Sequence, residues 1–160
     1  MHDDDDAMAD EIDAFMAPRA PALTSPNVGL LFRDSMDTAK DYYKRTGIFP
    51  IMHLIGVRKT LAEKHPWLPA AVLKAFEQSK AAALAQLIDV SATKVTLPFV
   101  EEQVAAAQAL MGEDFWPYGL EKNRTTIEAF LKFGFEQGVC HKKLSAEELF
   151  AKQVLTSYKV

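Results

Sequence analysis

Several features that would narrow the function of this protein are scarce or missing in its sequence. One cysteine, Cys140, stands among 160 residues, which excludes an internal disulfide and a zinc site built from several thiolates. No apolar run reaches about 18 residues, so a membrane-spanning helix is excluded. The formal net charge of −4 gives no general attraction to nucleic acid or to an anionic membrane. No secretory-type leader opens the sequence, and a cytoplasmic protein is therefore expected.

The residues that are present predict one domain preceded by an acidic leader. Hydrophobic residues make up 49% of the sequence, which is enough to form a core. Residues 1–9 include four consecutive aspartates, which repel one another and predict a solvated, disordered segment. Residues 10–160 are expected to form a single partial domain.

Apolar spacing and helix-terminating residues predict a helix-rich chain. The main helices are expected at 34–47, 66–88, 98–111 and 123–137. Asp34 is a good N-cap for the first of them, and Gly47 ends it. The spacing of a capping box occurs twice, in the pairs Thr60 with Glu63 and Ser145 with Glu148.

Two apolar runs predict short β-strands, at 12–17 and at about 52–57. Two or three strands cannot form a complete α/β sheet, because strands buried on both faces need several neighbours. Either the chain is a small α+β domain, or it is one part of a larger α/β protein. A core strand beginning almost at the first residue favours the larger protein.

Several stretches resemble the C-terminal part of the 4,5-dihydroxyphthalate decarboxylase family. They are "IDAFMAPRAP", "YYKRTGIFPIMH", "HPWLPAAVLKAFEQSKAAAL", "DFWPYGLEKNRTTIEAF" and "LSAEELF", and they occur in the order of the family between residues 10 and 150. That family is related to the type 2 periplasmic binding proteins, two-lobed α/β folds with a ligand cleft between the lobes. The resemblance implies the end of the second lobe, the return strand and the C-terminal helices of the first lobe. A missing N-terminal half or a second copy is the implied protein partner.

The function that the resemblance implies is a carboxy-lyase acting on a dihydroxylated aromatic dicarboxylate such as 4,5-dihydroxyphthalate. Its ligand is then a small aromatic carboxylate, and no organic cofactor or metal is expected. Two alternatives remain, a solute-binding protein of an ABC-transport system and an inactive, truncated half.

Such a reaction needs cations that hold the carboxylates, and three arginines are candidates. Arg19 follows the strand at 12–17, and open α/β folds place ligand groups at the carboxyl ends of strands. A surface arginine on a loop explains Arg19 equally well. Arg45 is the second candidate, although a basic residue at a helix end also compensates the helix dipole. Arg124 is the third.

The reaction also needs an acid that protonates the ring carbon as CO₂ leaves, and His53 is the candidate. It interrupts the apolar run "IFPIMHLIGV", where an aliphatic residue would otherwise stand. An imidazole can exchange a proton near neutral pH. The alternative is a core histidine that hydrogen-bonds a backbone carbonyl. His65, beside Pro66, fits a helix entrance better than catalysis, and Cys140 is taken as structural despite its neighbour His141.

The aromatic loop, residues 114–119, is the last candidate feature. Trp116 and Tyr118 could stack on an aromatic ligand, but the loop lies between two amphipathic helices, where apolar side chains fix a chain turn. Asn123 is expected to cap the following helix. The loop is therefore predicted to be a structural plug that rims the cleft.

Overall fold

A computed structural model describes residues 13, 14, 16, 28–91 and 96–155 of the chain. The chain divides into two compact units, residues 1–39 and 40–160. The boundary expected after residue 9 lies outside the described residues, as does the acidic leader, and both stay predictions. The candidate site lies within the second unit.

Helix α2 (Ser35–Thr46) begins and ends where the sequence predicts. Asp34 caps its first turn, because the backbone N–H of Asp37 donates to Asp34 Oδ1 at 3.1 Å. Gly47 ends the helix with a φ of +66°, a left-handed conformation that favours glycine.

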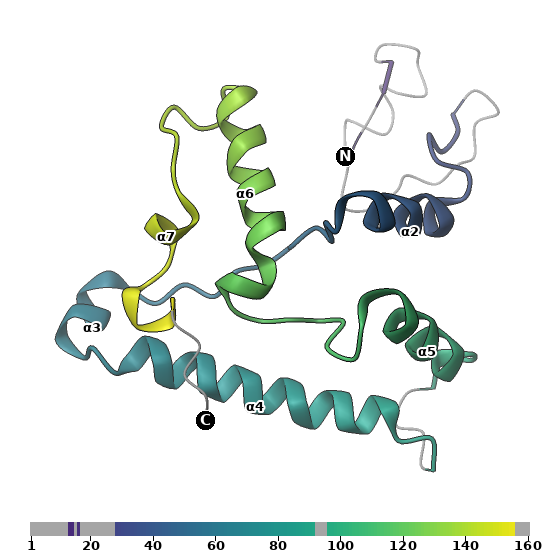
Figure 1. Ribbon diagram of the computed structural model, residues 1–160, viewed down its shortest axis with the longest axis horizontal. Coiled ribbons are helices and arrows are strands. Elements are labelled where there is room, and N and C mark those ends of the chain that lie inside the picture. The colour runs from purple at the N-terminus through teal and green to yellow at the C-terminus, as the bar shows by residue number, and fades with distance from the viewer. Residues whose placement is uncertain (1–12, 15, 17–27, 92–95, 156–160) are drawn as a thin grey trace. The chain divides into compact units, whose positions relative to one another are not determined.

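Helix α2 crosses the boundary between the two units, and the helices that follow it lie in the second unit (Figure 1). They are α3 (Lys59–Lys64), α4 (Leu68–Ile88), α5 (Val100–Met111), α6 (Leu120–Glu136), the short α7 (Ala146–Leu149) and a 3₁₀ turn, η1 (Lys152–Val154). Helix α4 contacts α3, α5 and η1, whereas α6 contacts α7. The predicted helices are therefore confirmed, with shifts of a few residues at their ends.

Two of the predicted helix starts are wrong. Thr60 lies inside α3, whose N-cap is Arg58, so Thr60 is not a capping residue. Asn123 lies inside α6, which begins after Gly119. The capping box of Ser145 and Glu148 is confirmed at the start of α7.

The expected strands find no pairing partner in the part of the chain that the structure describes. Residues 51–58 form neither helix nor strand and link α2 to α3 as an open stretch (Figure 1). Half of the run at 12–17 lies outside the described residues. A strand is defined by its hydrogen-bonded neighbour, so the sheet and the two-lobed fold stay predictions.

The buried core of the second unit is small and lies between α6 and α7. Leu120, Ile127 and Ala146 are buried there, and Leu131 packs against them. Leu120, Ile127 and Leu131 share one face of α6, since they are separated by seven and four residues. On the same helix, Phe130 is 72% exposed.

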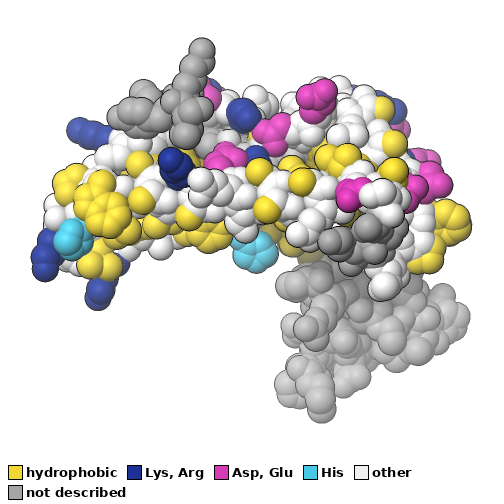
Figure 2. Space-filling model, turned by 90° about the horizontal axis from the view of Figure 1, so that it is seen from below, with side chains coloured by type: hydrophobic (Ala, Val, Ile, Leu, Met, Phe, Trp, Pro, Cys, Tyr) yellow, Lys and Arg dark blue, Asp and Glu magenta, His cyan; other side chains and the backbone are white. Residues whose placement is uncertain are grey.

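Many other apolar side chains of the described chain remain exposed to solvent. Figure 2 shows hydrophobic side chains spread over much of one face. Met52, Leu54 and Trp67 are 81%, 65% and 64% exposed. None of the helices in the described ranges is long and apolar enough to cross a bilayer.

Candidate functional site

A cavity of about 1000 Å³ lies within the second unit. The segments that line it include the end of α2, the segment 49–57, the aromatic loop, the start of α6, the first turns of α4 and the chain between α7 and η1. Its aromatic lining residues are Tyr43, Phe49, Phe76, Phe115, Trp116, Tyr118 and Phe150. Its polar lining includes His53, Asp114, Lys122, Asn123 and Thr126. The cavity is therefore mainly apolar with a few polar groups, as ligand sites usually are.

Lys80, on α4, anchors the aromatic loop. Its ammonium group donates to Asp114 Oδ1 at 3.2 Å and to the backbone oxygen of Trp116 at 3.3 Å. It also lies 3.0 Å from Glu77 Oε2 and 4.6 Å from the centre of the Tyr118 ring. The side chain of Lys80 is only 11% exposed, so its ammonium group has lost most of its hydrating water. The contacts with these partners compensate for that loss.

Asp114 joins two lysines at the edge of the cavity. Its second carboxylate oxygen accepts a hydrogen bond from Lys122 at 2.7 Å. Partial burial alone would raise the pKa of Asp114, but the hydrogen bonds from Lys122 and Lys80 outweigh it and lower that pKa. Burial alone would lower the pKa of Lys80, and its bonds to Glu77 and Asp114 raise it instead. Asp114 and Lys80 are thus both held in their charged forms.

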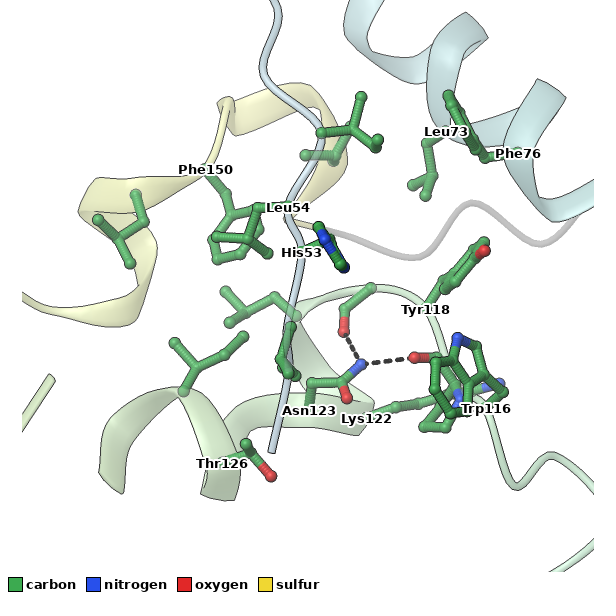
Figure 3. Close-up of a pocket in the computed structure, with 18 of the residues that line it drawn as sticks. His53, Leu54, Leu73, Phe76, Trp116, Tyr118, Lys122, Asn123, Thr126 and Phe150 are labelled. Carbon is green, nitrogen blue, oxygen red and sulfur yellow. Dashed lines mark hydrogen bonds between the residues drawn. The ribbon is translucent and has the colours of Figure 1, made fainter. Parts of the chain in front are cut away.

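Asn123 ties the end of the aromatic loop to α6 (Figure 3). Its side-chain nitrogen donates to the backbone oxygens of Pro117 and Gly119, both at 2.9 Å. Gly119 has a φ of +88°, which a residue with a Cβ rarely adopts. The Asn123 amide thus stabilises the turn just before α6, and the N-cap of the helix is Gly119.

The loop is both anchored and part of the cavity wall. The rings of Phe49 and Trp116 meet edge to face, with their centres 5.6 Å apart, so the loop also contacts the segment 49–57. The sequence predicts a plug at the rim of a cleft, and the structure places the loop residues from Asp114 to Gly119 along the lining.

Among the predicted catalytic and carboxylate-binding residues that the structure describes, His53 alone lies in the cavity lining. In Figure 3 its imidazole points from the segment 49–57 toward the side where Phe76 and Tyr118 lie. The residue is exposed, and no residue of the described chain hydrogen-bonds its ring. A buried histidine satisfied by a backbone carbonyl is therefore not what the structure shows.

The predicted arginines do not join His53. Arg19 lies outside the described residues. Arg45, at the end of α2, stacks 5.9 Å from the ring centre of Tyr42 and is absent from the cavity lining. Their assignment to a substrate carboxylate stays a prediction.

Arg124 is also absent from the cavity lining, and three carboxylates surround it. Its guanidinium lies 2.6 Å from Glu121, 3.1 Å from Glu128 and 2.8 Å from Glu147. The hydrogen bonds that its guanidinium donates to these carboxylates raise the pKa of Arg124 further above its ordinary value. A substrate carboxylate would have to compete with three protein carboxylates at this position.

Lys122 is a positively charged residue of the cavity lining that the sequence does not predict. It lies one residue before Asn123 and eight residues after Asp114. Its ammonium group and that of Lys80 both donate hydrogen bonds to the Asp114 carboxylate. An exposed lysine in the first turn of a helix gives no recognisable signal in the sequence.

Nowhere in the described ranges do three histidine, cysteine, aspartate or glutamate side chains gather to hold a metal ion.

Comparison with known proteins finds a similar decarboxylase. No model of a known protein family matches the sequence. The chain is 50% identical over 153 residues, 94% of its length, to a 4,5-dihydroxyphthalate decarboxylase from Comamonas testosteroni. Over nearly all of its length the chain is therefore similar to part of a 4,5-dihydroxyphthalate decarboxylase. The match covers 46% of the relative, so the chain spans about half the length of this family member. A half-length match agrees with the expected C-terminal half of the fold.

Proposed function

We propose that this chain forms part of the active site of a carboxy-lyase acting on a dihydroxylated aromatic dicarboxylate such as 4,5-dihydroxyphthalate. The 50% identity to a decarboxylase of that name carries the proposal. The cavity supports it, because aromatic side chains line a space that a substituted benzene ring could enter. Residues equivalent to the part of the relative that this chain does not match would complete the site.

The proposed reaction needs protonation of the ring at the carbon that bears the leaving carboxylate. Each hydroxyl group of 4,5-dihydroxyphthalate is para to one carboxylate and raises the electron density at that carbon. A proton donor adds H⁺ there, the bond to the carboxylate carbon breaks, and its electron pair returns to the ring as CO₂ departs. Only a proton is consumed, so the chemistry requires no oxidant or reductant.

His53 is the proposed proton donor. It lines the cavity and no described residue occupies its ring nitrogens, so both are accessible to a ligand. A histidine in this position can also recover its proton from solvent, because the residue is exposed.

The substrate carboxylates need cations, and the proposal assigns them to Arg19, with Arg45 and Arg124 as further candidates. Lys122 joins this group, because it lines the cavity beside Asn123. A carboxylate contact that is equally strong in the ground and transition states affects KM more than kcat. Arg19→Ala should therefore raise KM and lower kcat less, whereas Arg58→Ala, at the N-cap of α3, should change neither.

The decisive experiment measures CO₂ release from 4,5-dihydroxyphthalate by the chain combined with the rest of the Comamonas testosteroni enzyme. His53→Gln should lower kcat by about 10²–10⁴-fold with little change in substrate binding, as expected for loss of a general acid. His65→Gln is the matched control, because His65 packs against Trp67, with ring centres 6.0 Å apart, and does not line the cavity. Equal, small effects of both substitutions would contradict the role of His53.

A solute-binding protein would give a different result in the same experiment. The ligand would bind with no release of CO₂, and His53→Gln would alter affinity alone. That outcome would overturn the lyase proposal while leaving the cavity as the ligand site.

A further inference from the structure

Lys122 is placed differently from the other basic side chains near the cavity. Among the lysines and arginines in the described ranges, it alone belongs to the cavity lining. Lys80 holds the aromatic loop but is absent from that lining. In the view of Figure 3, Lys122 and Tyr118 lie on the side of the segment 49–57 toward which the His53 imidazole points. A ligand in the cavity therefore meets one ammonium group from the described part of this chain.

The ammonium group of Lys122 can exchange its partner with little loss of free energy. In the described ranges its ion pair is with Asp114, at 2.7 Å from Oδ2, and the Lys122 side chain is 61% exposed. Ion pairs of exposed side chains are weak, because water and salt screen them. Arg124, by contrast, is held by three carboxylates. A ligand anion can therefore replace Asp114 at Lys122 more readily than it can find a place at Arg124.

Asp114 keeps a partner when Lys122 turns to a ligand. Its other carboxylate oxygen, Oδ1, accepts a hydrogen bond from the Lys80 ammonium group at 3.2 Å. A partly buried carboxylate that lost all of its partners would carry a desolvation penalty, which the contact with Lys80 avoids. The aromatic loop can thus stay anchored through Lys80 while Lys122 binds a ligand.

The two carboxylates of the proposed substrate differ in what a bound cation does to the reaction. The carboxylate that leaves becomes neutral CO₂, so a cation bound to it stabilises the ground state more than the transition state. Such a contact raises the barrier. The other carboxylate keeps its charge throughout, and a cation bound to it holds the ring in place without opposing the reaction.

We propose that Lys122 binds the carboxylate that the substrate retains. Without ligand, Asp114 is the counter-ion of Lys122, and the retained carboxylate takes that position on binding. This inference rests on the proposed reaction and names the contact that orients its substrate. Lys122 is then a specificity-determining residue, because it favours aromatic ligands that carry a carboxylate.

Kinetics and calorimetry together test the inference, on the chain combined with the rest of the Comamonas testosteroni enzyme. Lys122→Gln should raise KM for 4,5-dihydroxyphthalate by about 10–100-fold, the loss expected for a charge-assisted hydrogen bond, and should lower kcat less. The product, 3,4-dihydroxybenzoate, carries the retained carboxylate and should lose affinity by a similar factor. Catechol, which has the same hydroxyl groups and no carboxylate, should bind equally well to both proteins.

Three further variants separate a ligand contact from damage to the cavity. Lys122→Arg keeps the charge and should restore the affinity for 3,4-dihydroxybenzoate. Lys132→Gln is the matched control, because Lys132 is 65% exposed on the same helix and is absent from the lining. Asp114→Asn removes the competing carboxylate and should tighten 3,4-dihydroxybenzoate relative to catechol. Comparing two ligands on one variant cancels any loosening of the aromatic loop.

Each other outcome has a distinct meaning. A rise in kcat on Lys122→Gln would assign Lys122 to the leaving carboxylate and overturn the proposal. Equal loss of catechol and 3,4-dihydroxybenzoate would show a contact with the hydroxyl groups or a damaged cavity, and unchanged affinity for both would show no contact; either result would overturn it. If no protein releases CO₂ but Lys122→Gln still weakens 3,4-dihydroxybenzoate alone, the carboxylate contact is confirmed and only the proposed reaction is contradicted.

Discussion

Glu148 shows how strongly single contacts act at the residue scale. Its carboxylate accepts hydrogen bonds from the Lys142 ammonium group and from the Ser145 backbone N–H, both at 2.8 Å. These two contacts lower the pKa of Glu148 to about 2. The capping box that starts α7 therefore depends on an ionised carboxylate.

The first prediction concerns pH. Because the pKa of Glu148 is lower in the folded chain than the ordinary 4.5, its contribution to stability is present above about pH 4.5 and is lost as pH falls toward 2. NMR titration of the Glu148 carboxyl carbon should give a midpoint near 2, and Lys142→Met should raise that midpoint. A midpoint near 4.5 in the unsubstituted chain would show that the capping box is not formed in solution.

Lys80 carries the second prediction at this scale. Lys80→Met should lower the free energy of unfolding by about 1–3 kcal/mol, because Asp114 and the Trp116 carbonyl lose a partly buried charged donor. Hydrogen exchange in the aromatic loop should rise at the same time. Lys74→Met, an exposed lysine on the same helix, should change neither quantity. If both variants behave alike, Lys80 does not anchor the loop.

At the element scale, the helices are predictable from the sequence because their signals are local. Asp34 and Gly47 bound α2 through bonds and backbone angles that involve neighbours in the chain. The start of α6 is harder to predict, because it depends on contacts outside the helix. Asn123 resembles an N-cap, but its amide reaches back to the carbonyls of Pro117 and Gly119, which places the helix start earlier.

The cavity could be predicted less well, because it joins segments that are far apart in sequence. Lys80 bonds Asp114 across 34 residues, and no local pattern reports such a pair. His53 was found because it interrupts an apolar run. The contacts of Arg124 with Glu121 and Glu128 follow helical spacing, whereas its contact with Glu147 depends on how α7 packs on α6.

Arg124 gives the prediction at the element scale. Arg124→Ala should loosen α7 from α6, because Glu147 loses its partner at 2.8 Å, and hydrogen exchange of residues 145–150 should rise. Lys132→Ala is the control, because its partner Glu136 lies 4.0 Å away on the same exposed helix surface. Unchanged exchange together with weaker substrate binding would instead support the predicted ligand role of Arg124.

For the whole molecule, the described residues bury few large side chains and expose many. Phe130 and Val139 are 72% and 80% exposed, and Met52 is 81% exposed. Monomeric proteins seldom expose apolar patches beyond about 300–600 Å². The isolated chain should therefore self-associate or bind a hydrophobic dye. A monodisperse monomer with a cooperative thermal transition and no dye binding would contradict this prediction.

The exposed apolar surface has a consequence for the amount of this protein in a cell. Chaperones and proteases continuously sort chains that display such surface, so a change of about 1–2 kcal/mol in stability alters abundance several-fold. Self-association would cover part of that surface and remove molecules from that sorting by mass action. The lifetime of the chain would then rise with its own concentration.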